Sequence, residues 1–177
     1  MIYEKENPVG IDKALGRFQK KLETIGIPDV HIYGRIYLNK KGDDILPQVH
    51  VKGKDYESVF INDKHTGDIG FLIDGTRTGF DMINTKVKMI CSFNLDRVYD
   101  TTKRNDEELL LQVVDSISKL AKAPDWGEIN TDFDEVYREV TRSKFKARQM
   151  QPWFNFSVEF TLRYVNDICD YIAIDNN

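Results

Sequence analysis

The sequence predicts an α+β fold, with a single antiparallel or mixed β-sheet that carries two main amphipathic helices on one face. In two stretches, about 11–25 and 105–121, apolar residues recur every three or four positions, as on one face of a helix. Between these stretches, segments rich in β-branched and aromatic residues alternate with short turns. The helices are too few for regular βαβ alternation, so residues 1–177 are expected to form one α+β domain.

The first helix is expected over about 11–25. Gly26 is suited to the C-terminal cap, and Pro28 prevents the helix from continuing. The residues at spacings of four and three that form its apolar face are Ile11, Leu15, Phe18, Leu22 and Ile25.

The strands of the sheet are expected between about 30 and 95. Segments that fit a strand lie at 30–38, 45–53, 56–63, 68–75 and 86–95. The stretch 39–44 is interpreted as a turn and 76–85 as irregular, because both combine glycine with polar residues. Short turns between consecutive strands favour antiparallel pairing.

The second main helix is expected over about 105–121. Asn105 can cap its N-terminus, and Glu108 completes a capping-box pattern. Its apolar face is expected to consist of Leu110, Val113, Val114, Ile117 and Leu120. A short helix is expected over about 132–140, and residues 166–177 are expected to form a C-terminal tail.

The segment over about 153–165 is the best-defined feature, because apolar and polar residues alternate along it with a period of two. The apolar face is expected to pack in the core against the two helices. The polar face, the ends near Trp153 and Asp167, and the preceding basic run remain available for interaction. The apolar face consists of Phe154, Phe156, Val158, Phe160, Leu162 and Tyr164.

No catalytic, cofactor-binding or metal-binding residues are predicted, and the protein is not expected to be an enzyme. The three histidines lack HxH, HExxH and Cys-His spacing, and neither G-x-S-x-G nor a phosphate-binding G-x-x-x-x-G-K-[ST] motif is present. His31 and His50 fall in strand-like segments and could approach each other. Cys91 and Cys169 lie far apart in sequence and are interpreted as buried, reduced thiols.

The composition argues against two classes of binding partner, nucleic acids and membranes. The net charge of −4 argues against a protein that binds nucleic acid electrostatically, so direct nucleic-acid binding is not expected. The first ten residues contain no apolar signal-peptide region, and no apolar run approaches the roughly 20 residues of a membrane helix. We therefore expect a cytoplasmic protein that does not contact a membrane.

Several charged residues are candidates for a protein interface. Arg77 lies in a glycine-rich segment, and Trp153 begins the last predicted strand. In the run 141–148 the basic residues are two apart, so an extended conformation would place them on one side; a solvated linker is the open alternative. The possible interface residues are Lys40, Lys41, Asp43, Asp44, Arg77, Arg142, Lys144, Lys146, Arg148 and Trp153.

Three segments, in this order, carry a resemblance to a known family. They are KVKMICSFNLDRVYD (86–100), NDEELLLQVVDSISKL (105–120) and WFNFSVEFTLRY (153–164). The chain resembles the tail terminator and tail-completion proteins of tailed bacteriophages, which are neck or head–tail connector proteins. The resemblance covers most of the chain in the order and pattern of its elements.

The resemblance implies a structural virion protein that forms a ring, typically sixfold, at the head-proximal end of the tail. Its implied partners are further copies of itself, the tail tube protein and the neck or connector proteins, and no cofactor is implied. The implied location is the host cytoplasm during assembly and then the virion. Two alternatives remain open: a small ligand- or metal-binding domain that uses His31, His50 and the acidic loops, and a host-side adaptor that binds a protein through a sheet edge.

Overall fold

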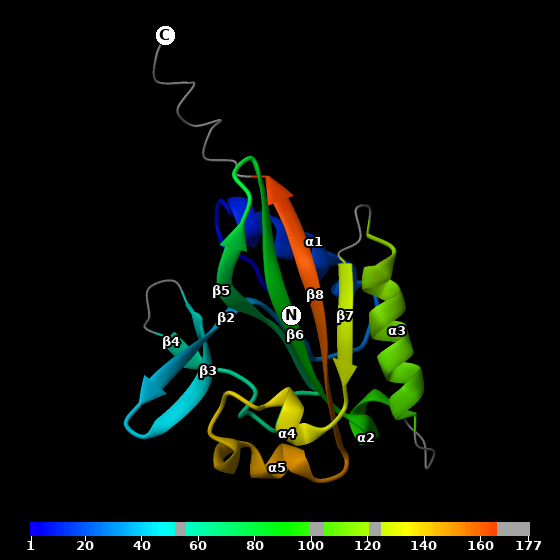
Figure 1. Cartoon of the computed structure of the whole chain (residues 1–177). Coiled ribbons are helices and arrows are strands. Elements are labelled where there is room, and N and C mark those ends of the chain that lie inside the picture. Colours follow the sequence, from blue (N-terminus) through cyan, green and yellow to red (C-terminus); the bar gives the residue numbers. More distant parts are fainter. Residues whose placement is uncertain (52–55, 100–104, 121–124, 166–177) are drawn as a thin grey trace.

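A computed structural model describes residues 1–51, 56–99, 105–120 and 125–165 of the chain (Figure 1). The expected C-terminal tail lies outside the described residues. No helix in these ranges is long and apolar enough to cross a membrane. The elements in chain order are β1 (Ile2–Tyr3), α1 (Gly10–Glu23), β2 (Val30–Lys41), β3 (Asp44–His50), β4 (Tyr56–Ser58), β5 (Gly67–Thr78), β6 (Met82–Asn94), α2 (Leu95–Val98), α3 (Asp106–Ser118), β7 (Asp125–Asn130), α4 (Phe133–Val136), the 3-10 helix η1 (Arg142–Phe145), α5 (Lys146–Gln149) and β8 (Trp153–Val165).

The eight strands form one mixed sheet in the order β4-β3-β2-β5-β6-β8-β7, and β1 pairs with β2. The pairs β1–β2 and β2–β5 are parallel, while the other neighbours are antiparallel. The expected α+β class with a mixed sheet is therefore confirmed. The strand β2 changes neighbours along its length, because its first half pairs with β5 and its second half pairs with β3.

The last strand confirms the clearest pattern in the sequence. β8 spans 153–165 as expected and pairs with β6 along its full length. Five of the six apolar residues on its predicted core face are buried, and Phe154 is partly buried against the same cluster. Phe160 stacks on Phe18 of α1 with ring centroids 5.2 Å apart, so this face packs against the helices.

The two main helices cover one face of the sheet, as expected (Figure 1). Leu109 lies outside the predicted apolar face of the second helix, yet it is fully buried, and its neighbour Leu110 is buried as well. The helix residues buried in this cluster are Ile11, Leu15, Phe18 and Leu22 of α1 and Leu109, Leu110, Val113 and Ile117 of α3.

A second hydrophobic cluster lies on the opposite face of the sheet. Residues of β2, β3 and β6 pack there against side chains from α4, from η1 and from the segment between them. Tyr137 and Phe145 are fully buried there, with ring centroids 4.9 Å apart. This cover extends over part of β8, since Asn155 and Ser157 on its polar face are also buried. The expectation that the polar face of β8 is available for interaction is therefore wrong for its first half.

Several boundaries differ from the sequence predictions. The stretch 76–85 is not irregular, because it contributes to β5 and β6, which meet in a tight turn. The strand expected at 56–63 ends at Ser58. β1 and β7 were not predicted at all. Both are short, and the six residues of β7 contain only two apolar side chains, too few to show a period of two.

Three further local predictions also need correction. The run 141–148 is not extended, because η1 and α5 occupy it and turn Phe145 into the core. Asn105 does precede α3, but its side chain makes no capping hydrogen bond, so the predicted capping box is not formed. The helix expected at 132–140 is shorter, and Asp132 caps it by accepting from the backbone N–H groups of Asp134 and Glu135.

We expect Phe156→Ala and Phe160→Ala each to lower the free energy of unfolding by about 3–5 kcal/mol, because each removes a buried ring from the sheet–helix core. Urea unfolding followed by far-UV circular dichroism would measure the change. Glu159→Ala, on the exposed face of the same strand, is the matched control and should change stability by about 0.5 kcal/mol at most. Unchanged stability in both Phe variants would contradict the core assignment.

Candidate functional site

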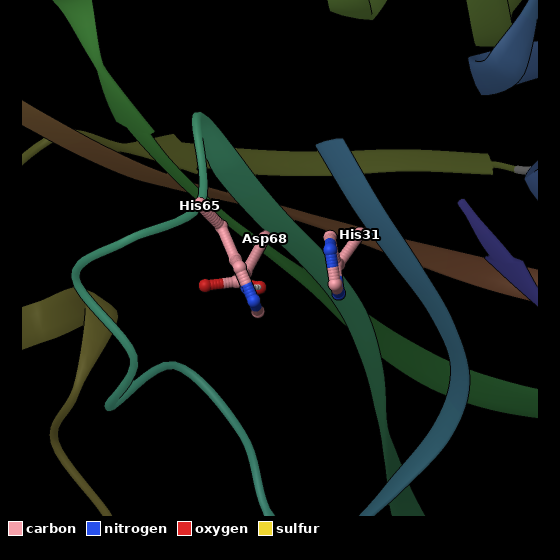
Figure 2. A group of neighbouring side chains, drawn as sticks. All are labelled: His31, His65 and Asp68. Atoms are coloured by element: carbon pink, nitrogen blue, oxygen red, sulfur yellow. Dashed lines mark hydrogen bonds and ion pairs between the residues drawn. The ribbon is translucent and has the colours of Figure 1, made fainter. Parts of the chain in front are cut away.

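A buried cluster of charged and polar side chains lies where β2 and β5 begin (Figure 2). His31 of β2 lies opposite Asp68 of β5 in the parallel ladder, so both side chains project from the same face of the sheet. His65 comes from the loop just before β5, three residues before Asp68. Together with Arg148 of α5, these residues form what we call the His–Asp–Arg cluster.

The two imidazole rings of the cluster stack on each other, with centroids 3.5 Å apart and planes 16° from parallel. Each ring also has hydrogen-bonding partners. The Tyr3 hydroxyl lies 3.0 Å from Nδ1 of His31. On His65, Nε2 lies 2.8 Å from the amide nitrogen of Asn62 and Nδ1 lies 3.1 Å from Oδ1 of Asp68.

The carboxylate of Asp68 is the centre of the cluster. Its Oδ2 accepts a charge-assisted hydrogen bond from Arg148, and its Oδ1 accepts a hydrogen bond of 3.3 Å from the Tyr33 hydroxyl. Asp68 and Arg148 are 0% and 1% exposed, so this is a fully buried ion pair. A buried charge is tolerated only when it is paired and hydrogen-bonded, which explains why these groups contact each other.

Further contacts tie Arg148 to the middle of the sheet. Its guanidinium carbon lies 4.2 Å from the centre of the Trp153 ring, a cation–π contact. Its backbone carbonyl accepts a hydrogen bond of 2.6 Å from the Asn155 amide. The amide oxygen of Asn155 in turn accepts from the hydroxyls of Ser92 and Tyr137. The network therefore runs from β2 to β8 across the sheet.

The loop that carries His65 is held by an arginine from another element. Nη1 of Arg97, in α2, donates to the backbone carbonyls of Asp63, Lys64 and His65 at 2.5–2.9 Å. Because three consecutive carbonyls share one cationic donor, the backbone position of His65 is fixed from outside the cluster.

Burial shifts the protonation of the cluster. Burial, followed by the neighbouring His65, lowers the pKa of His31 below its ordinary value, although Asp68 and Asp29 act in the opposite direction. Burial, followed by the charge of Asp68, raises the pKa of the Tyr33 hydroxyl. His31 is therefore favoured in its neutral form, and Tyr33 remains a hydrogen-bond donor.

Two imidazoles and a carboxylate are a ligand set that suits first-row divalent metals, and one ligand atom from each of His31, His65 and Asp68 lies within 4.8 Å of the others. A metal ion binds in the plane of each imidazole, however. Two rings that face each other nearly in parallel do not point at a common ion unless one ring rotates. Arg148 also places a positive charge against the same carboxylate. The geometry therefore favours a hydrogen-bonded cluster over a metal centre.

The cluster differs from what the sequence suggested. His31 stacks on His65 rather than on His50, and the His50 ring instead lies 5.6 Å from the Tyr56 ring. Arg148 is buried, so the prediction that it belongs to an interface is wrong. Of the predicted thiols, Cys91 is free and buried, and Cys169 lies outside the described residues. The contacts among His65, Asp68 and Arg148 could not be predicted from the sequence, because they depend on how distant segments pack together. The H-x-x-D spacing of His65 and Asp68 is not specific to any known kind of site.

Apart from Trp153, the other candidate interface residues divide between two surfaces. Trp153 is half-buried under Arg148, and Arg77 is exposed on β5. The remaining residues lie around the β2–β3 turn and η1, where Lys144 pairs with Asp44 at 2.9 Å. Those around the turn and η1 are Lys40, Lys41, Asp43, Asp44, Arg142, Lys144 and Lys146.

The second surface is the far end of the sheet. β2 pairs with β5 only as far as Leu72, and β7 pairs with β8 only as far as Thr161. Beyond these points β5, β6 and β8 continue as a three-stranded extension. One face of it is buried against the start of α1 through Leu162 and Tyr164, and the β5–β6 turn forms its tip (Figure 1). We call residues 74–86 with 162–165 the arm. Its tip exposes three large apolar residues, Phe80, Met82 and Val165.

Comparisons of the chain with protein-family models, with curated proteins and with solved structures find no match.

We expect Asp68→Asn and Arg148→Met each to destabilise the fold by about 3–5 kcal/mol, because each leaves a buried charge without its partner. The double variant should cost clearly less than the sum of the two. A double-mutant cycle by urea unfolding would measure this coupling. Strictly additive losses would show that the two groups do not act as a pair.

The lowered pKa of His31 predicts lower stability in acid. The folded state binds the proton on His31 less readily than the unfolded chain, whose histidine titrates near pH 6.5. The stability that neutral His31 provides is therefore present above that pH and is lost as the pH falls through the lower folded pKa. Melting temperatures between pH 8 and pH 5 would test this. His31→Gln should flatten the acid slope, whereas His50→Gln, at an exposed position, should not.

Proposed function

We propose that this chain is a structural assembly protein, which self-associates and joins other structural proteins, as the resemblance to bacteriophage tail terminator and neck proteins implies. In this proposal it forms a ring at the head-proximal end of a tail, between tube and head connector. The observation that carries the proposal is the tip of the arm, which presents the apolar side chains of Phe80, Met82 and Val165 to solvent.

The arm has the character of a contact surface. Phe80 is 88% exposed at the turn between β5 and β6, and Met82 and Val165 lie opposite each other at the end of the β6–β8 ladder. Phenylalanine and methionine are enriched in protein–protein interfaces relative to the rest of the protein surface. An exposed apolar group rimmed by polar residues, here Arg77, Thr78 and Asp81, is typical of a protein–protein contact.

The buried cluster fits a supporting role in this proposal. Its charged groups bond to one another, to backbone or to aromatic rings, and they attach α5 and the His65 loop to the sheet. In this proposal the His–Asp–Arg cluster stabilises the positions of α5 and the His65 loop and does not take part in a reaction. The expected work of the protein is therefore binding rather than catalysis.

The proposal predicts that the purified chain forms a closed oligomer, either alone or together with a tail tube protein. Native mass spectrometry over a concentration series would give the stoichiometry, and negative-stain electron microscopy would show whether the particles are rings. Tube protein with its interacting end blocked by a fused domain is the control for nonspecific association.

A chain that stays monomeric at high concentration and also binds no tube protein would contradict the proposal. Both results are needed, because a subunit that assembles only on the tube would be monomeric by itself.

A further inference from the structure

We propose that the stacked rings of His31 and His65 form an acid-sensitive latch, which holds the His65 loop (residues 61–66) and α5 on the sheet and releases them when both rings are protonated. The release is local, so the β6–β8 ladder and the two long helices stay folded. This inference concerns the conformation of the single chain and does not depend on the proposed assembly function. It follows from the geometry of the two rings, from the charges around them and from the way in which the loop is held.

The first proton is accommodated in the closed cluster. Nδ1 of His65 lies 3.1 Å from Oδ1 of Asp68, so a protonated His65 forms an ion pair with a carboxylate that Arg148 also contacts. Asp68 is fully buried, and a buried charge is screened less by water than an exposed one. Its attraction for the neighbouring imidazolium therefore keeps the loop in place.

The second proton, on His31, is poorly accommodated. The two rings lie face to face with centroids 3.5 Å apart, so protonating both places two positive charges against each other (Figure 2). His31 is only 8% exposed, and water therefore screens little of this repulsion. The carboxylate of Asp29 lies 3.5 Å from Nε2 of His31, but its side chain is 56% exposed, so its compensating attraction is screened.

The other charged and titratable groups that face the two rings do not remove the repulsion. The Tyr3 hydroxyl, 3.0 Å from Nδ1 of His31, is a neutral partner, and burial raises its pKa. The ammonium group of Met1 also disfavours a proton on His31. The groups from the surrounding elements are Met1 and Tyr3 at β1, Asp29 before β2, Tyr33 of β2, Asp68 of β5, Arg97 of α2 and Arg148 of α5.

The His65 loop is the part of the cluster that can move. His31 and Asp68 lie opposite each other in the parallel pairing of β2 with β5, so neither can move away without breaking the sheet. Residues 61–66 belong to neither a helix nor a strand. The bonds from Arg97 hold the loop at an exposed position, where water can replace them. Repulsion between the rings is therefore relieved by displacement of the loop.

Arg148 transmits this displacement to α5. Its Nη2 donates to the backbone carbonyl of Asn62 at 2.5 Å as well as to Asp68, and the Asn62 amide nitrogen lies 2.8 Å from Nε2 of His65. A displaced loop removes the Asn62 carbonyl from a guanidinium group that is 1% exposed. A buried cationic donor that loses an acceptor must be hydrated, so water enters between the loop and α5.

The latch lies on one face of the sheet only. His31 and Asp68 are followed in their strands by Ile32 and Ile69, whose side chains are buried on the other face, in the cluster beneath α1 and α3. Opening the latch therefore leaves that cluster covered. The chain can present two shapes of the surface formed by the His65 loop and α5, and the pH selects between them.

Residue-resolved hydrogen exchange of the purified chain, followed by NMR between pH 8 and pH 5 and corrected for intrinsic exchange, tests the latch. Two amides report on the loop: Thr66 N–H donates to the Asp29 carbonyl at 3.1 Å, and Asn94 N–H donates to the Thr66 carbonyl at 2.8 Å. Their protection should fall below about pH 6.5, by up to about tenfold per pH unit, because opening takes up one proton on His31. Dilute urea should accelerate exchange in β6 and β8 but not at Thr66, because a local opening exposes little surface.

Three glutamine variants separate the contributions of the rings. His31→Gln should abolish the acid-dependent exchange at Thr66. His65→Gln should reduce it, because His31 can then be protonated inside the closed cluster without an opposing charge. A merely structural role of His65 would instead raise exchange equally at every pH. His50→Gln, at an exposed position of β3, is the matched control and should behave like the parent chain.

The movement of α5 has its own readout. Arg148 lies over the Trp153 ring, so opening should expose that ring to water and shift its fluorescence emission to longer wavelength over the same pH range. A Trp126→Phe background removes the other tryptophan.

Exchange at Thr66 that does not accelerate in acid, or that accelerates equally in His31→Gln, would overturn the latch. So would an unchanged acid response in His65→Gln, since the repulsion between two rings would then play no part. Exchange at Thr66 that responds to urea as β6 and β8 do would show that the whole chain unfolds. Each of these results would leave the assembly function standing.

Discussion

The antiparallel ladder between β6 and β8 is the constraint on which the rest of this structure depends. It runs the full length of both strands, and the residues on its two faces contribute to two separate hydrophobic clusters. Val87, Met89 and Cys91 point toward α1 and α3, whereas Ile90 between them points toward the other cluster. A slip of one residue in this register would exchange the two faces and leave neither cluster intact.

The ion pair between Asp68 and Arg148 has a different effect. It joins β5 to the short helices before β8 across a long stretch of sequence, with both charges withdrawn from water. A buried pair of this kind often contributes little net stability compared with an apolar replacement. Its effect here is geometric, because the contact between the guanidinium and the carboxylate holds α5 in place on the sheet.

The sequence predicted what depends on local periodicity. The length of β8, its core face and the apolar faces of the two long helices were all available from the spacing of apolar residues. Features that depend on tertiary context were not. From the sequence alone, Arg148 in its basic run is expected to be solvated, and only the folded structure places Asp68 beside it. The pairing of β2 with β5, rather than any sequence motif, brings His31 next to His65. Edge strands such as β7 lack a period because little of their surface is buried.

The order of the elements also has a kinetic consequence. β8 is the last described strand, yet it fills the place between β6 and β7 in the sheet. Until it inserts, β6 offers an unpaired edge and the helices have no Phe156, Val158 or Phe160 to cover. Pairings between strands so far apart in the chain close slowly, and the intermediates that wait for them are prone to aggregate. During synthesis, this sheet can be completed only after β8 has emerged from the ribosome.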